Sequence, residues 1–374
     1  MRYPSIDVLR TLAIFLMVFV HFAENLSGYQ IPFIGLGAPL FALLMGASYR
    51  LWLNGQLAKG KSEESISKVS VRRGLFIFGC GFAFNILIWL PEDTFNWDVL
   101  TCIGAALLVL NFTRRLPLPI SVVIAVLAIW ISPLLRNEAD YQAYWTEGYY
   151  AGDLTLTDLF IGFTTTGYFP FFPWIAYSLS GFVAASRLFR EPAPAVESAA
   201  HDSEAEEPPP SCWPTTLLGM ALLSTAALLL IARPYLPPAI GQKFLGGWHM
   251  FPPTIEYVVA TIGMCLFLLG VTHQWIDRNP AALRFRGLLN VAKTFSRYSL
   301  TLYVLHHVIH LWPMWIYGVA MGTEPTYFWQ QVQPTTTALL LACAFLLICY
   351  GVLQRLGPDQ KVGLESWMHW LCDD

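Results

Sequence analysis

Long apolar runs alternate with shorter polar connections along most of this 374-residue chain. A helix needs about 20 mostly apolar residues to cross the hydrocarbon of a membrane, where it satisfies its own backbone hydrogen bonds. Runs of this kind occur at ten places, residues 6–26, 32–54, 74–91, 98–113, 117–135, 167–188, 214–232, 253–275, 297–317 and 336–356. The pattern predicts an all-α protein, a polytopic bundle of about ten transmembrane helices.

The charges in the connections predict the orientation of this bundle. An even number of spans puts both termini on one side, and most Lys and Arg residues outside the spans fall on that side. Only Arg136, Arg233 and Lys243 fall on the opposite side. Because cytoplasmic loops carry the excess of Lys and Arg, both termini are predicted to be cytoplasmic.

One connection differs from the others in composition. Residues 191–212 are rich in Pro, Ala and Glu and hold almost no large apolar side chains, which predicts a disordered acidic linker in the cytoplasm. The linker separates two parts of the chain. Residues 1–190 hold the first six spans with the candidate catalytic helix, and residues 213–374 hold the last four spans and a cytoplasmic tail.

The composition agrees with an integral membrane protein. Hydrophobic residues make up 55% of the chain and charged residues 13%, and the mean hydropathy is +0.51. No basic patch indicates binding to nucleic acid. No two cysteines meet in an external connection, and none has the spacing of a metal site, so neither a disulfide nor a metal is expected.

The first span is unusual because four ionisable residues interrupt it: Asp7, Arg10, His21 and Glu24. At about 100° per residue, Arg10 and His21 point the same way, and the other two lie within about 60° of that line. A charged side chain at the bilayer centre costs about 2.5 to 3.5 kcal/mol even on the lenient insertion scale, so this stripe is expected to face a cavity. The alternative is structural: Arg10 snorkels to the headgroups, Glu24 lies at the far interface, and His21 is a hydrogen-bonded packing residue.

Two pairs of residues outside the first span are candidate ligand sites. Arg72 and Arg73 end a cytoplasmic segment, where they are either charges at the membrane surface or a clamp for a phosphorylated ligand. His306 and His310 are an i, i+4 pair whose spacing is compatible with a metal ion. No third ligand is evident in the sequence, so no metal is predicted.

Four local patterns concern other parts of the chain. Small residues between 35 and 47 predict close packing of the second span against the first. Pro170 and Pro173 predict an irregular start of the sixth span, as is tolerated where backbone lines a cavity. Glu256, one turn into the eighth span, is explained by the helix dipole alone. Aromatic residues of the external stretch 136–166 are either interfacial anchors or platforms for sugar rings.

Five motifs, in order, resemble bacterial relatives of the heparan-α-glucosaminide N-acetyltransferase family. They are IDVLRTLAIFLMVFVHF, GAPLFALLMGAS, FPFFPWIAYSLSG, MFPPTIEYVVATIG and SRYSLTLYVLHH, and they extend over nearly the whole chain. The ten residues between Arg10 and His21 are also similar to the hallmark of the wider acyltransferase-3 group. The resemblance implies a ten- or eleven-helix enzyme of the bacterial cytoplasmic (inner) membrane. Such an enzyme takes an acyl group, expected to be acetyl, from cytoplasmic acyl-CoA and delivers it to a carbohydrate or glycolipid acceptor outside.

The resemblance also implies roles for individual residues. His21 would be the catalytic base and Arg10 essential. Bacterial members often carry Asp soon after this His, whereas this chain reads HFAEN, so Glu24 would orient the imidazole or the orienting carboxylate lies elsewhere. The candidate catalytic residues are thus Asp7, Arg10, His21 and Glu24. The oxyanion would be stabilised by Arg10, His306 or a backbone amide near Pro173.

Binding residues and partners complete the expected picture. Arg72, Arg73 and Arg297 would bind the CoA phosphates at the cytoplasmic mouth. The candidate substrate-binding residues are Arg72, Arg73, Arg297, Trp174, Glu256, His306 and His307. The expected partners are acyl-CoA, the acceptor, membrane lipids and either a second copy or a membrane complex. Two other functions remain open, a transporter or flippase whose polar stripe lines a path, and a non-catalytic membrane subunit.

Overall fold

The structure, a computed structural model, describes residues 2–32, 35–89, 95–148, 155–189, 211–237, 241, 244–322, 333–356 and 362–373. Within these ranges the chain is helical, and the only β pairing is one isolated bridge between Met250 and Pro253. The long helices are α1 (Pro4–Ser27), α2 (Gly37–Ala58), α3 (Glu63–Phe84), α4 (Val99–Thr113), α5 (Leu118–Glu138), α8 (Phe171–Leu188), α9 (Trp213–Ala232), α11 (Ile255–Thr272), α13 (Ser299–Met321) and α15 (Thr335–Leu356). The all-α prediction is therefore confirmed for the described part of the chain.

Shorter helices connect and cover the long ones. They are α6 (Tyr141–Ala143), α7 (Leu156–Ile161), α12 (Arg286–Arg297) and α16 (Leu364–Cys372). Single π-helical turns extend some of them, η1 (Asn85–Trp89), η3 (Tyr144–Gly148), η4 (Gly162–Thr166) and η6 (His273–Asp277). Two 3₁₀ turns follow α9 and precede α12, η5 (Arg233–Tyr235) and η7 (Pro280–Phe285).

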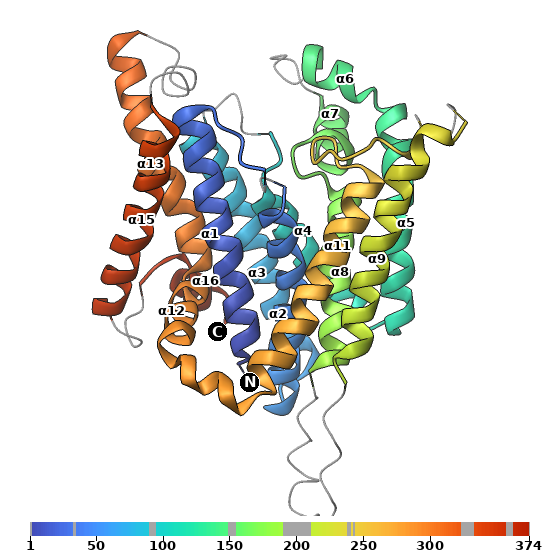
Figure 1. The fold of residues 1–374 in the computed structure, drawn as a ribbon, viewed down its shortest axis with the longest axis vertical. Helices are drawn as coiled ribbons and strands as arrows, with labels where there is room; N and C mark the ends of the chain where they lie inside the picture. Colours follow the sequence, from blue (N-terminus) through green and yellow to red (C-terminus); the bar gives the residue numbers. More distant parts are fainter. Residues whose placement is uncertain are drawn as a thin grey trace, which may run out of the picture.

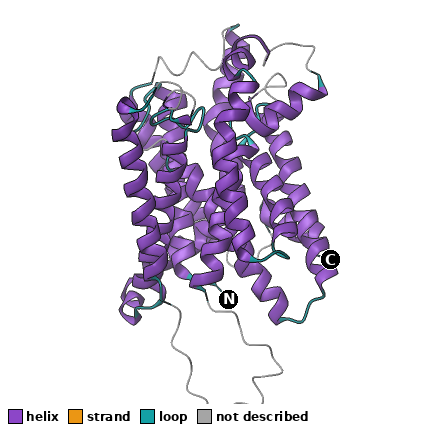
Figure 2. Cartoon of the chain, turned by 90° about the vertical axis from the view of Figure 1, so that its right-hand side faces the viewer, coloured by secondary structure: helices purple, strands orange, loops and turns teal. Residues whose placement is uncertain are grey.

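Each of the ten predicted spans falls on one long helix. Six stretches in the described residues are long and apolar enough to cross a membrane: Pro4–Ser27, Glu63–Ile88, Leu118–Glu138, Trp213–Tyr235, Ile255–Asp277 and Thr335–Leu356. Both chain ends lie toward one end of the bundle (Figures 1 and 2), called here the N-terminal end. Ten spans and a cytoplasmic location for this end stay predictions. Residues 191–210 of the predicted linker lie outside the described residues.

Helix α1 contributes side chains to two hydrophobic cores, and Figure 1 shows it between α13 and α15 on one side and α2 and α11 on the other. Ile6, Leu9 and Ala13 belong to the core formed with α2, α4, α5, α8 and α11. Ile14 and Phe22 belong to a second core, formed with α3, α12, α13 and α15. Because α1 is apolar on two sides, its polar stripe is confined to the seam between the two cores.

The small residues of α2 pack mainly against α8 instead of α1. A Cβ added at Gly46 would lie 1.8 Å from the carbonyl oxygen of Ser178, and one added at Gly181 would lie 1.9 Å from that of Leu43. Only glycine permits this backbone approach. Of the predicted stripe, Gly37 does face α1, near Ala13. The predicted irregular start of α8 is confirmed, because Phe172 has non-helical φ and ψ angles.

Candidate functional site

A cavity of about 1660 Å³ follows α1 for most of its length. It exceeds the roughly 300–1,000 Å³ of ordinary small-molecule sites. At the N-terminal end it is lined by Arg2, Lys59, Arg73, Arg297 and His369. At the opposite end it is lined by Asn25, Gln30, Tyr168, Trp248, His249 and Phe251. Asp7, Arg10, His21 and Glu24 all line it, so the stripe predicted from helical periodicity faces one continuous space.

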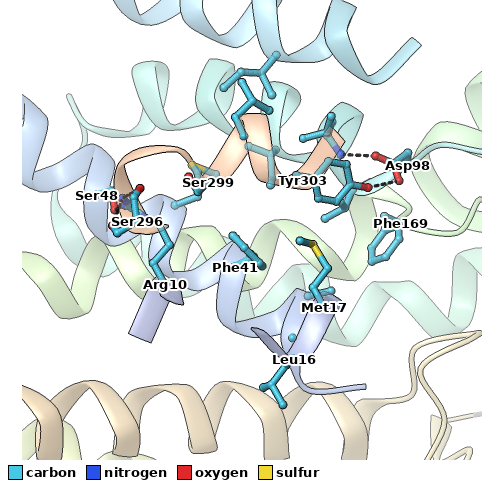
Figure 3. Close-up of a pocket in the computed structure, with 18 of the residues that line it drawn as sticks. Arg10, Leu16, Met17, Phe41, Ser48, Asp98, Phe169, Ser296, Ser299 and Tyr303 are labelled. Atoms are coloured by element: carbon cyan, nitrogen blue, oxygen red, sulfur yellow. Dashed lines mark hydrogen bonds between the residues drawn. The ribbon is translucent and has the colours of Figure 1, made fainter. Parts of the chain in front are cut away.

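Near the N-terminal end, Arg10 joins three helices. Its Nη1 donates to Ser296 Oγ of α12 at 3.0 Å, and its Nη2 donates to Ser48 Oγ of α2. Ser296 Oγ in turn donates to Asp7 Oδ1 at 2.6 Å, and Arg2 Nε donates to Asp7 Oδ2 at 2.6 Å. Figure 3 shows Arg10 directed at Ser48 and Ser296. We call these five residues the arginine cluster; its hydrogen bonds tie α1 to α2 and α12.

Three turns further along α1, His21 meets the histidines of α13. His21 Nδ1 lies 2.9 Å from His306 Nε2, with the two rings nearly parallel at 12°. His307 lines the cavity beside His21, at 4.6 Å between ring centroids. His310 Nε2 instead lies 2.8 Å from Asn25 Nδ2. We call His21, His306, His307 and His310 the imidazole cluster.

The imidazole cluster supplies the third nitrogen ligand that the sequence did not reveal. His21, His306 and His307 each offer a ligand atom, and these atoms lie within 4.8 Å of one another. The three imidazoles whose ligand atoms lie close enough to share a metal ion therefore include His21 and His307, and not His310. The 2.9 Å distance between His21 Nδ1 and His306 Nε2 is that of a hydrogen bond, so these two imidazoles are hydrogen-bonded to each other. The expectation of no metal stays a prediction.

Glu24 lies one turn beyond His21 but has a different partner. Its Oε1 accepts a long hydrogen bond from Gln30 Nε2 at 3.5 Å. The contact at His21 Nδ1 comes from His306. The structure therefore brings His306 to the position at which the sequence suggested a carboxylate.

A second hydrogen-bonded pair lines the cavity opposite α1. Tyr303 donates its hydroxyl to Asp98 Oδ2 at 2.7 Å, and Asp98 Oδ1 accepts from the backbone N–H of Leu100 at 2.9 Å (Figure 3). Asp98 is the N-cap of α4. Sequence reasoning assigned neither residue to the site, although an Asp directly before an apolar helix could have indicated the cap.

At the N-terminal mouth, Arg73 lines the cavity and Arg72 does not. The guanidinium of Arg73 donates to both carboxylate oxygens of Asp373, at 2.8 and 2.5 Å, and lies 5.0 Å from the ring of Trp52. Partial burial tends to raise the pKa of the Asp373 carboxyl, but hydrogen bonds from His369 and Arg73 outweigh it and lower the pKa to about 2. The tail helix α16 thus contributes an anion to the mouth.

Asn54 is a further residue of this mouth that the sequence did not single out. It lines the cavity and is buried, yet neither atom of its side-chain amide makes a hydrogen bond within the described residues. A buried amide without partners is costly unless a ligand or water satisfies it. The sequence could have indicated this residue, because Asn54 is a polar side chain within an otherwise apolar segment.

Two predicted substrate-binding residues lie behind the cavity wall. Trp174 is fully buried, and its ring packs edge-on against that of Phe169, which does line the cavity. Glu256 is also fully buried and accepts from the backbone N–H of Gly247 at 2.9 Å. Neither is among the lining residues, so both support the wall at the opposite end. Arg297 and His307 do line the cavity, whereas His306 does not and lies against His21 and His307, which do.

Comparison with known families gives a match over the first part of the chain. The model described as heparan-alpha-glucosaminide N-acetyltransferase, catalytic, matches residues 2–225, more than half of the chain. The matched part contains the arginine cluster residues of α1 and α2, as well as His21 and Arg73. It ends before α13, so His306 lies outside it. A search of curated proteins found no match.

Proposed function

This chain belongs to the heparan-α-glucosaminide N-acetyltransferase family, and on that basis we propose that it moves an acetyl group across the membrane from acetyl-CoA to a sugar acceptor. The acceptor offers a hydroxyl or an amine and is a carbohydrate or glycolipid. The membrane is the cytoplasmic membrane of a bacterium, with the N-terminal end of the bundle inside. The observation that carries this proposal is the single cavity that joins a basic mouth to an aromatic one past His21.

The basic mouth suits the donor. Arg2, Lys59, Arg73 and Arg297 line it, and guanidinium groups pair well with phosphates. Arg73 already holds the Asp373 carboxylate, so a CoA phosphate would compete with Asp373 for the same donors. The unsatisfied amide of Asn54 lies in the same wall and offers one donor and one acceptor edge to a polar part of the donor.

The opposite mouth suits a sugar. Trp248, Phe251 and Tyr168 line it with aromatic rings, and the rings of Tyr168 and Phe251 meet edge to face at 5.5 Å. Asn25, Gln30 and Glu24 line the cavity below them. A flat apolar surface beside amide and carboxylate groups matches a sugar ring, which has apolar faces and hydroxyl edges.

His21 lies between these mouths and acts as the base. Its imidazole takes the proton from the acceptor hydroxyl or amine while the acceptor oxygen or nitrogen bonds to the acetyl carbonyl carbon. The C–S bond then breaks, and the departing thiolate receives that proton as free CoA. Thioester and acceptor thus become an ester or amide and a thiol, with atoms and charge balanced.

Arg10 has a different part in this scheme. His21 lies eleven positions further along the helix, a rise of about 16 Å, so the two side chains cannot both contact one carbonyl group. Arg10 is also engaged by Ser48 and Ser296. We therefore assign it to holding α1, α2 and α12 together beside the donor, and not to stabilising the oxyanion.

The test uses purified protein in detergent and acetyl-CoA labelled in the acetyl group. Glucosamine, which offers an amine and hydroxyls, and methyl glucoside, which offers hydroxyls only, serve as acceptors. We expect acceptor-dependent release of CoA, with label on the sugar, and loss of both with His21→Gln. Reconstituted vesicles with acetyl-CoA on one side and sugar on the other test transfer across the membrane. Sugar movement without CoA would indicate a transporter, and no binding of acetyl-CoA at all would indicate a non-catalytic subunit.

A further inference from the structure

The proton positions of the imidazole cluster follow from backbone carbonyl groups. His306 Nδ1 lies 3.1 Å from the carbonyl oxygen of Leu302, and His307 Nδ1 lies 3.2 Å from that of Tyr303. His310 Nδ1 lies 2.5 Å from the carbonyl oxygen of His306. A carbonyl oxygen can only accept, so each of these Nδ1 atoms carries its hydrogen. Helix α13 thereby fixes the tautomers of its own histidines.

This assignment determines the tautomer of His21. A neutral imidazole with hydrogen on Nδ1 has its lone pair on Nε2. His306 Nε2 is therefore an acceptor, and the group 2.9 Å away, His21 Nδ1, must donate to it. The lone pair of His21 is then on Nε2. His21 lines the cavity, so a basic nitrogen is available on the ring that substrates approach.

We propose that His306 is a positioning residue, which holds His21 in the tautomer whose Nε2 can accept the acceptor's proton. The inference deepens the proposed function and rests on it. His306 takes the place that a buried carboxylate has in a catalytic triad, where it fixes the tautomer and orientation of the base. When Nε2 takes up the proton, the imidazolium keeps Nδ1–H on His306 Nε2, and that hydrogen bond becomes stronger because its donor is charged.

The burial of His306 explains why an imidazole, and not a carboxylate, orients His21. His306 is fully buried in the middle of α13, a helix predicted to span the membrane. An ionised carboxylate at such a place costs free energy that a neutral imidazole does not. Glu24, the nearest carboxylate on α1, contacts Gln30 at the aromatic end of the cavity. A neutral orienting group is therefore the arrangement that this position favours.

Kinetics of three variants test the proposal with acetyl-CoA and glucosamine. His306→Leu removes the acceptor for Nδ1–H, whereas His306→Gln keeps a carbonyl oxygen that can accept it. His310→Gln is the matched control, because His310 has the same contact to the helix backbone but meets Asn25 and not His21. A wrong tautomer costs about 10⁴-fold in a serine protease. We expect His306→Leu to lower kcat by about 10²- to 10⁴-fold with little change in KM, and His306→Gln to recover most of the loss.

A spectroscopic readout separates positioning from a merely structural role. In protein labelled with ¹⁵N-histidine, the His21 signals are those lost in His21→Gln. We expect the Nδ1-protonated form of His21 in the wild type and in His306→Gln, and the Nε2-protonated form in His306→Leu. An unchanged tautomer in His306→Leu would overturn the inference. So would one zinc ion per chain held by His21, His306 and His307 in the purified protein, because the metal would take the lone pairs.

The two proposals can fail separately. Full turnover in His21→Gln would reject the base and the proposed mechanism together. An inactive His21→Gln beside a His306→Leu variant with wild-type kcat would reject only the role of His306.

Discussion

The arginine cluster and the imidazole cluster occupy the same stripe of α1 but are built differently. Around Arg10, charged groups are compensated and held from several sides: Asp7 accepts from Arg2 and Ser296, and Arg10 donates to two serines on other helices. Around His21 the titratable groups are imidazoles, and His21 is held through Nδ1 while its ring also lines the cavity. The first arrangement suits an anchor, and the second suits a group that must exchange a proton.

The difference has an energetic basis. A buried charge that loses its partner is strongly destabilising, whereas an imidazole that stays neutral carries no such penalty. Substitutions in the arginine cluster should therefore act first on folding. Substitutions of His21 and His306 should act first on turnover.

The largest expected effect on activity is that of His21→Gln. Loss of a general base typically lowers rates by about 10²- to 10⁴-fold, so we expect CoA release to fall by that factor. The melting temperature in detergent should hardly change, because Gln is of similar length and polarity. Acetyl-CoA binding, measured by calorimetry, should persist. Turnover near the wild-type level would show that the chemistry occurs elsewhere in the cavity.

Next comes Arg10→Met, which keeps the length of the side chain but removes its charge and donors. Ser48 and Ser296 lose a charged donor, for which a cost of about 1–3 kcal/mol in stability is expected. Thermal unfolding in detergent measures the effect, and Arg10→Lys, which keeps the charge, should lose less. If Arg10→Met instead lowered kcat at an unchanged melting temperature, Arg10 would belong to the chemistry and the contrast between the clusters would disappear.

Helical periodicity predicted which residues of α1 share a face, but it could not predict their partners. Arg10 and His21 line one cavity, as their spacing indicated. Ser296 and His306, which contact them, lie 286 and 285 residues further along the chain. Which side chains meet across helices depends on how each helix is rotated and crossed, and local sequence does not contain that information.

The same limit explains the predicted residues that do not line the cavity. Trp174 was expected at the substrate because it belongs to a motif, and it lies one aromatic layer behind Phe169. His306 and His310 share one face of α13, as their spacing indicates, but they contact different residues of α1, His21 and Asn25. A motif identifies the wall, and packing decides which of its residues reach the surface of the cavity.

Glu24→Gln sharpens the comparison with a smaller expected effect. Glu24 accepts only a 3.5 Å contact from Gln30 in the described structure, so its charge does not orient His21. We expect kcat to change less than about fivefold, in contrast to the general-base range for His21. We expect a larger change in KM for the acceptor than in kcat, since Glu24 lines the aromatic end of the cavity. A kcat loss as large as that of His21→Gln would return the orienting role to Glu24.

The smallest expected effect is that of Asp373→Asn. It tests whether the ion pair between Arg73 and Asp373 holds the tail helix α16 against the bundle. Asp373 pairs with Arg73 there, but a third of its side chain is exposed, at 33%, so the pair is screened by water. Cys372, the residue directly before Asp373, is buried. We expect Asp373→Asn to raise the modification of Cys372 by a maleimide about two- to fivefold, measured by mass spectrometry, with Cys372→Ser identifying the thiol.

Acid has a predictable influence on the same contact. The pKa of Asp373 lies below its ordinary value, at about 2, because hydrogen bonds from His369 and Arg73 outweigh the opposing effect of burial. A carboxyl group with a lowered pKa stabilises the fold fully above its ordinary pKa, and that contribution is lost as the pH falls through the lowered value. Acidification from about pH 7 to about pH 5 should therefore not reproduce the effect of Asp373→Asn through this carboxyl group. If α16 were released in that range in the wild type and equally in Asp373→Asn, a group other than Asp373 would hold it in place.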